Sequence, residues 1–211
     1  MRRGLSIAEL IRQDVLDFGA EPPHPPCPIP PRLLILACSA TKATGEGLVA
    51  RDRYQGPLWQ TLRVADPDGS KAFVCFLSAK FGLGDARDAL PHYDRVLTDA
   101  DADRMVEGKT WACYPELPQS SRMTMAARLR ATRQHGPRRS PSGVLTLLER
   151  ELGQPFRAVA ICGGHRYVRV ACSWLPDFQV MHQLAADAPV RVINGPIGVM
   201  RAKLRAWLMQ G

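Results

Sequence analysis

Four short apolar runs lie along the chain, and each one ends in a polar or glycine-containing turn. They are Arg32–Cys38, Ala72–Leu77, Ala158–Cys162 and Val190–Ile193. Continuous apolar runs of this length are typical of strands that are buried on both faces of a parallel sheet. Stretches with helical spacing lie between and after them, at about 49–65, 142–152, 165–173 and 198–209. The alternation predicts an α/β fold with a mostly parallel central sheet of about four to five strands, flanked by helices.

The first 31 residues differ from the rest of the chain. Residues 5–18 have apolar positions at helical spacing and stop at Gly19, which predicts a short amphipathic helix. A proline-rich connector follows up to Pro31, where missing backbone donors disfavour a helix. We therefore expect an N-terminal helix and connector at 1–31, and a single α/β domain at 32–211.

The segment from about 98 to 142 does not fit the alternation of strands and helices, and we interpret it as an arginine-rich insertion. No acidic residue lies between Leu117 and Leu148. Residues 121–135 have the composition of a basic helix, while 136–143 is rich in glycine, proline and serine. The alternative interpretation is a solvated surface loop. The insertion contains six arginines: Arg122, Arg128, Arg130, Arg133, Arg138 and Arg139.

The positive charge is concentrated in the second half of the chain. Up to Pro115 there are 14 basic and 15 acidic residues, whereas from Glu116 onward 14 basic residues face 5 acidic ones. Such an excess suits nucleic acid, because each neutralised phosphate releases counterions. Arginine outnumbers lysine 23 to 5, and an arginine-rich genome would produce a similar excess without a polyanion. We expect a nucleic-acid partner, with DNA favoured over RNA, and the sequence leaves the oligomeric state open.

Several classes of protein are not indicated. No run of 18 apolar residues occurs, and no apolar core follows the two N-terminal arginines, so we expect neither a membrane span nor a secretory signal but a cytoplasmic protein. The six cysteines form no C-x-x-C pair, so neither a disulfide framework nor a metal site is predicted. Neither G-x-G-x-x-G nor G-x-x-x-x-G-K-[ST] occurs, and no cofactor is predicted.

Polar side chains at the strand ends are candidates for the chemistry. The first turn contains Cys38, Ser39 and Lys42, and the second contains Ser78 and Lys80. In open α/β sheets, ligands bind at the carboxyl ends of the strands. Two ammonium groups at that edge would hold an anion, or one of them would become a nucleophilic amine if repulsion lowered its pKa. The alternative for Lys42 is a solvent-exposed loop lysine.

Other titratable residues are weaker candidates. Asp94 follows the second strand in a turn and is interpreted as a general base, a nucleophile toward a sugar carbon, or a counter-ion. His165 follows a glycine pair after the third strand and is interpreted as an acid/base group or as a capping histidine. Trp59 and Trp207 lie on helix-like faces and are expected in the core.

An ordered set of motifs resembles a known family. They are A-C-S-x-x-K at 37–42, A-R-D-R-Y-x-G at 50–56, L-S-A-K-F-G-L at 77–83, P-x-Y-D at 91–94, G-G-H-x-Y at 163–167 and G-P-I-G at 195–198. This order resembles an uncharacterised bacterial and phage family that is similar to the YaaA-like proteins. More remotely, the first turn is similar to one in the lyase domain of archaeosine synthases, which are relatives of tRNA-guanine transglycosylases. The resemblance covers about 32–97 and 157–208.

The resemblance implies a nucleobase or nucleic-acid context, with base excision, base exchange or deazaguanine handling as the activities it suggests. Our leading hypothesis is an enzyme that acts on a nucleobase N-glycosidic bond in DNA or RNA. Such a site needs a carboxylate, a base pocket and cations for phosphates. Asp94 or Asp52 would supply the carboxylate and Lys42 the amine of a Schiff base. Tyr54 or Tyr93 would stack on the base, and Lys80 or Arg53 would hold phosphate. The remaining residues expected at the site are Cys38, Ser39, Gly56, Ser78, Gly82, Gly164, His165 and Tyr167.

The arginines of the insertion would then contact the nucleic-acid backbone. Two alternatives remain open at this point. One is a non-catalytic DNA-binding protein of a stress response or of phage defence, which would use the same basic surface. The other is an enzyme acting on free nucleosides or nucleotides, for which the insertion would be dispensable.

Overall fold

The computed structural model describes residues 29–116 and 138–210, and it confirms the α/β fold. Five strands form one sheet in the order β3-β2-β1-β4-β5, in which only β2 and β3 are antiparallel to each other. The four predicted strands are confirmed, and β3 is an additional edge strand. The bounds are β1 Arg32–Ala37, β2 Phe73–Ser78, β3 Gly82–Asp85, β4 Ala158–Cys162 and β5 Val190–Ile193.

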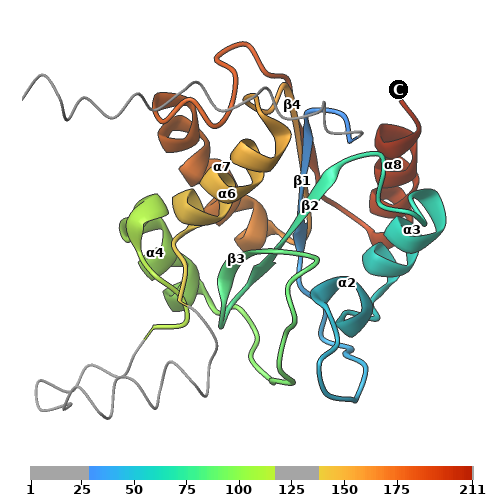
Figure 1. Cartoon of the computed structure of the whole chain (residues 1–211). Helices are drawn as coiled ribbons and strands as arrows, with labels where there is room; N and C mark the ends of the chain where they lie inside the picture. The colour runs from blue at the N-terminus through green and yellow to red at the C-terminus, as the bar shows by residue number, and fades with distance from the viewer. Residues whose placement is uncertain (1–28, 117–137, 211) are drawn as a thin grey trace, which may run out of the picture.

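Helices cover both faces of the sheet and give the described part of the chain three layers (Figure 1). One face packs against α2 (Ala50–Arg53), α3 (Pro57–Ala65) and α8 (Ile197–Met209). The other face packs against α4 (Asp99–Glu107), α6 (Pro141–Leu152) and α7 (His165–Val180). A short 3₁₀ helix, η1 (Lys109–Trp111), follows α4.

The continuous apolar runs are explained by this layering. In β1, Leu33 and Ile35 belong to the core beneath α6 and α7, whereas Leu34 and Leu36 belong to the core beneath α3 and α8. Successive side chains of a strand point to opposite faces, so a strand covered on both faces needs apolar residues at every position. Trp59 and Trp207 lie in the second of these cores, as expected.

Two predicted helices have different bounds. The stretch at 49–65 is divided into α2 and α3, because the chain is extended at Tyr54 and Gly56 before Pro57 begins the second helix. The helix predicted at 165–173 continues to Val180 and includes Pro176. Proline normally ends a helix, so its presence here could not be expected from the sequence.

The insertion does not begin at residue 98. Thr98 and Asp101 form a reciprocal capping box that starts α4, and Ala102 and Met105 are buried in the same core as α7. Tyr114 is also part of this core. Residues 98–116 therefore belong to the packed domain. The helix was not predicted because its sequence is mostly polar and only a narrow face of it is apolar. Arg122, Arg128, Arg130 and Arg133 lie outside the described residues, as does the helix expected at 5–18.

Within the two described ranges, no helix combines the length and apolar character that crossing a membrane requires.

Candidate functional site

The strand order reverses between β1 and β4. The chain passes from β1 to β2 on one side of β1 and later returns to β4 on its other side. In open α/β sheets, ligands bind outside the carboxyl ends of the strands at the point where the strand order reverses in this way. These ends lie at the lower edge of the sheet in Figure 1. The turn after β1 and the turn after β4 therefore flank the candidate site.

The two turns come into contact through small residues. A β-carbon on Gly163 would lie 2.5 Å from the β-carbon of Ala37, so only glycine fits at this end of β4. Beyond this contact, Cys38 Sγ lies 3.2 Å from the phenol oxygen of Tyr167. A β-carbon on Gly56 would likewise lie 2.4 Å from Ser39 Oγ. Close backbone packing thus fixes the positions of Cys38 and Ser39.

A buried hydroxyl cluster lies next to this contact, and we define it as Tyr54, Ser78 and Tyr93. The Tyr93 phenol oxygen is 2.6 Å from that of Tyr54 and 2.8 Å from Ser78 Oγ. Ser78 Oγ accepts hydrogen bonds from the backbone N–H groups of Lys80 and Phe81, which leaves its own proton to donate to Tyr93. The three residues are at most 4% exposed, so they are positioned from inside the fold.

Burial raises the pKa of the tyrosines near the turns that follow β1 and β4. Desolvation raises the pKa of Tyr54, Tyr93 and Tyr167 above the usual value of a phenol, and the proximity of Cys38 contributes in the same direction. All three therefore keep their protons at neutral pH and are hydrogen-bonding groups there. The hydroxyl groups of Tyr54 and Tyr93 form hydrogen bonds inside the fold. The burial of both residues leaves little ring surface for the expected stacking on a base.

Lys42 is brought to the hydroxyl cluster. The loop after β1 pairs with the α2–α3 junction through a backbone bridge between Lys42 and Tyr54. The Lys42 ammonium lies 4.5 Å from the centre of the Tyr93 ring and donates a hydrogen bond of 3.4 Å to the Ala40 carbonyl. The side chain is half-buried. An amine in contact with an aromatic face at the end of β1 is therefore the central chemical feature of the site.

Lys80 lies at the neighbouring strand end, but in different surroundings. Its ammonium is 5.4 Å from the centre of the Phe81 ring, and it borders a small charged cleft together with Arg95 and Asp101. Gly82 has a φ of +63°, and a β-carbon there would lie 2.5 Å from the Tyr114 ring. Gly82 therefore serves the tight turn into β3 and its packing against Tyr114.

The two predicted carboxylates are not brought together. Asp94 is exposed on the loop that follows Tyr93. Asp52 is exposed on α2 and lines a separate cavity with Asp68 and Phe73. Since Phe73 is the first residue of β2, this cavity is at the opposite end of that strand from Ser78. Of the two, only Asp94 is adjacent in the chain to a member of the hydroxyl cluster.

The guanidinium groups of three expected binding arginines contact the protein itself. Arg53 is fully buried and donates to the carbonyl oxygens of Leu90, Ala43 and Gly45 at 3.0, 2.8 and 2.8 Å. Arg138 donates to the carbonyl oxygens of Pro115 and Cys113, and Arg139 forms an ion pair of 3.1 Å with Asp88. These contacts hold loops in place.

The glycine turn after β4 is open to solvent. Gly164 precedes α7, and no atom lies within 4 Å of a β-carbon built on it. His165 is the first residue of α7 and is exposed. Tyr167, one turn further along, is the residue of this segment that reaches Cys38.

The sequence analysis did not identify Phe81 or Asp88. Phe81 packs edge to face against Tyr93 at 5.0 Å between ring centres, and Asp88 borders a cavity beside β3. Neither residue carries a signal of its own in the sequence, because their positions depend on β3 turning back along β2.

In residues 29–116 and 138–210, no three His, Cys, Asp or Glu side chains converge in a way that would hold a metal ion. In comparisons with known proteins, no family model, curated protein or solved structure matches the chain.

Proposed function

We propose that this protein is a cytoplasmic enzyme that acts on the N-glycosidic bond of a nucleobase, in DNA in preference to RNA. The observation that carries the proposal is the position of the Lys42 amine, over the Tyr93 ring in the loop that follows the carboxyl end of β1. This is the place where α/β enzymes bind their ligands. The resemblance of the strand-end motifs to nucleobase-handling proteins supports the choice of substrate.

In the proposed reaction, Lys42 is the nucleophile. The neutral amine forms a bond from Nζ to C1′ of the sugar while the bond from C1′ to the base nitrogen breaks. The bonding electron pair leaves with the base, and the proton lost from Nζ is transferred to that base nitrogen. Opening of the sugar ring then gives an iminium, which water hydrolyses to regenerate Lys42.

The surrounding groups position the reactants. The Tyr93 ring restricts Lys42, while the hydroxyls of Tyr54 and Ser78 hold Tyr93 in place. Cys38 and Tyr167 contact each other between the turn after β1 and the start of α7. Asp94, exposed beside Tyr93, is the carboxylate we assign to stabilising positive charge on the sugar. The proposal gives no catalytic role to Asp52.

The experiment is a search for released bases and for a covalent adduct. The full chain is incubated with single-stranded DNA, double-stranded DNA and tRNA, with and without modified bases. Released bases are identified by mass spectrometry, and borohydride is added to reduce any iminium to a stable link. We expect base release and trapping from DNA, both of them lost in Lys42→Ala.

The matched control is Lys203→Ala, because Lys203 is exposed on α8. It should release bases at the rate of the unchanged protein. Base release that persists in Lys42→Ala would refute the nucleophilic role of Lys42. Salt-sensitive DNA binding without base release from any substrate would favour the non-catalytic binding protein instead.

A further inference from the structure

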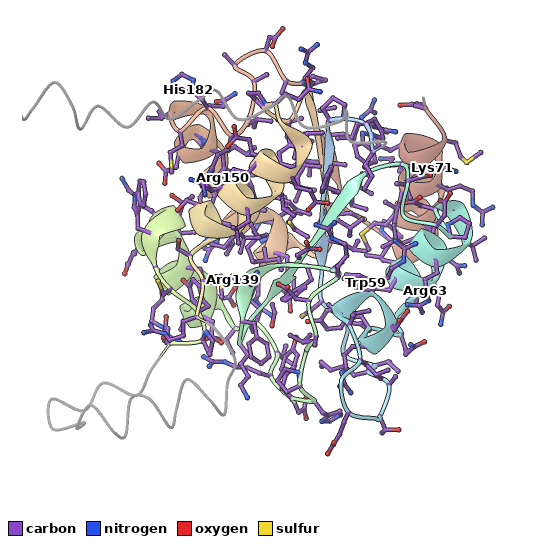
Figure 2. All side chains as sticks on the ribbon, viewed as in Figure 1. Trp59, Arg63, Lys71, Arg139, Arg150 and His182 are labelled. Atoms are coloured by element: carbon purple, nitrogen blue, oxygen red, sulfur yellow. The ribbon has the colours of Figure 1, made fainter. Side chains whose placement is uncertain are left out.

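A cavity of about 250 Å³ opens beside the edge strand β3. Aromatic side chains form much of its wall, namely Phe76, Phe81 and Tyr114. Its rim carries one carboxylate, Asp88, and one guanidinium, Arg139. Figure 2 shows Arg139 beside β3. A concave, mostly apolar space with a few polar groups is the usual form of a small-molecule site.

The shape of the cavity depends on Gly84. In the antiparallel pair this residue lies opposite Phe76, and a β-carbon on it would be 2.3 Å from the Phe76 ring. The absence of a side chain therefore lets the Phe76 ring lie against the backbone of β3. The Phe76 ring thus occupies the space that a side chain of β3 would otherwise fill.

Two polar groups of the cavity have unused hydrogen-bonding capacity among the described residues. Asp88 Oδ2 accepts a hydrogen bond of 3.1 Å from Arg139, whereas its Oδ1 has no partner there. The backbone N–H of Ala86 donates to the Val74 carbonyl, so these two residues form a hydrogen-bonded pair between the antiparallel strands β2 and β3. Every second residue of β3 counted from Ala86 points its N–H and C=O toward β2, and the residues between them point theirs away. Leu83, which lines the cavity, is one of the residues whose N–H and C=O point away from β2.

We propose that this cavity binds a planar heteroaromatic ring that carries N–H donors on its edge, of the size and class of a nucleobase. The mostly apolar wall encloses the ring, and the Asp88 carboxylate accepts from its N–H groups. The outward peptide group of Leu83 offers one donor and one acceptor to the same edge. Arg139 faces acceptor atoms of the ligand.

The cavity is connected to the site around Lys42 by one pair of rings. Phe81 forms part of the cavity wall and packs edge to face against Tyr93, the residue over which Lys42 lies. The Phe81 and Tyr93 rings would lie between a base held in the cavity and the amine that we assign as the nucleophile. The identification of the ligand as the substrate's own base therefore rests on the proposed function.

Direct binding tests the cavity separately from catalysis. Uracil and adenine are titrated into the full chain, and binding is measured by saturation-transfer NMR. A second titration uses 1,3-dimethyluracil, which keeps the ring but has no N–H group. The variants are Asp88→Asn, which removes the charge, and Ala89→Phe, which fills the cavity from an exposed lining position. The control is Asp187→Asn, in the exposed loop before β5.

We expect saturable binding of uracil or adenine that is weakened at least about tenfold in Asp88→Asn, as for the loss of a charge-assisted hydrogen bond. Ala89→Phe should lose binding with an unchanged circular dichroism spectrum, and Asp187→Asn should bind normally. 1,3-Dimethyluracil should bind more weakly and be insensitive to Asp88→Asn. The proposal is overturned if no base binds, or if both cavity variants bind bases as tightly as the unchanged protein does.

Base release, measured in parallel, separates the two proposals. Binding that depends on Asp88 without any base release would support the cavity and contradict the glycosidic activity. Release that depends on Lys42 and is unaffected by the cavity variants would support the activity and overturn the identification of the cavity's ligand as the substrate's own base.

Discussion

The phenol oxygens of Tyr54 and Tyr93 lie 2.6 Å apart inside the fold, and Tyr93 also bonds to Ser78. One hydroxyl group thus satisfies two buried partners. We expect Tyr93→Phe to lower the free energy of unfolding by about 1–3 kcal/mol, because both partners would be left unsatisfied. Urea denaturation followed by circular dichroism measures the loss.

Tyr114→Phe is the matched control for this prediction. Tyr114 is equally buried, but its hydroxyl has no hydrogen-bond partner among the described residues. Its removal should leave stability unchanged or raise it. Equal losses in Tyr93→Phe and Tyr114→Phe would mean that the hydroxyl cluster contributes nothing specific to stability.

The approach of β4 to β1 gives a second prediction. Gly163→Ala would place a β-carbon 2.5 Å from that of Ala37, so the strand ends must move apart. We expect a loss of about 1–3 kcal/mol, typical of overpacking. Gly164→Ala, whose β-carbon meets nothing within 4 Å, should cost at most about 1 kcal/mol. Thermal unfolding of the two variants side by side tests the difference, and similar values would contradict it.

Asp66 gives a pH-dependent prediction. This fully buried carboxyl, whose Oδ2 has no partner among the described residues, has a pKa raised above the ordinary 3.8 by burial. The folded state then binds more protons than the unfolded state just above pH 3.8, so stability falls as the pH rises through this range and is constant above it. Relative to Asp66→Asn, the unchanged protein should therefore lose stability as the pH rises from 4 to 7, which unfolding free energies of the two proteins measure.

Asp68→Asn provides a control of opposite sign. Hydrogen bonds from Ser70 lower the pKa of this exposed carboxyl below 3.8. It therefore contributes stability that is present above pH 3.8 and is lost as the pH falls through the lowered value. Relative to Asp68→Asn, the unchanged protein should gain stability as the pH rises. The same pH trend in both comparisons would rule out burial of Asp66 as the cause.

Arg53 carries the last prediction. Its guanidinium donates to three carbonyl groups from two loops, a set that a lysine ammonium cannot reproduce at the same three positions. We expect Arg53→Lys to lower stability by roughly 2–4 kcal/mol. Arg150→Lys, at an exposed position of α6, should be neutral (Figure 2). Unchanged stability in Arg53→Lys would show that these hydrogen bonds are dispensable.

Three strands of the sheet were predictable because of their burial on both faces. A strand covered by helices on each side must be apolar throughout, as β1, β2 and β4 are. β5 is an edge strand with three exposed residues, and only its short run of valine and isoleucine indicated it. β3 was not predictable, because Gly82 and Gly84 interrupt its apolar character. Their importance appears only when the Tyr114 and Phe76 rings are seen packed against them.

The location of the candidate site was predictable from the sequence, but the contacts between its side chains were not. Strand-end turns identified Cys38, Lys42 and Ser78, since parallel strands bring their ends to one edge. That Arg53 is buried, or that Tyr54 bonds to Tyr93, could not be read from the sequence, because residue spacing does not reveal which side chains point inward across a loop. Arginines in particular read as surface charge until their carbonyl partners are seen.

Ala37 and Gly163 pack against each other between β1 and β4, and neither residue has a side-chain rotamer to change. The separation of these two strand ends is therefore set by the hydrogen-bonded spacing of parallel strands. A change of ligand during evolution would have to arise in the loops around this contact, while the contact itself would stay the same.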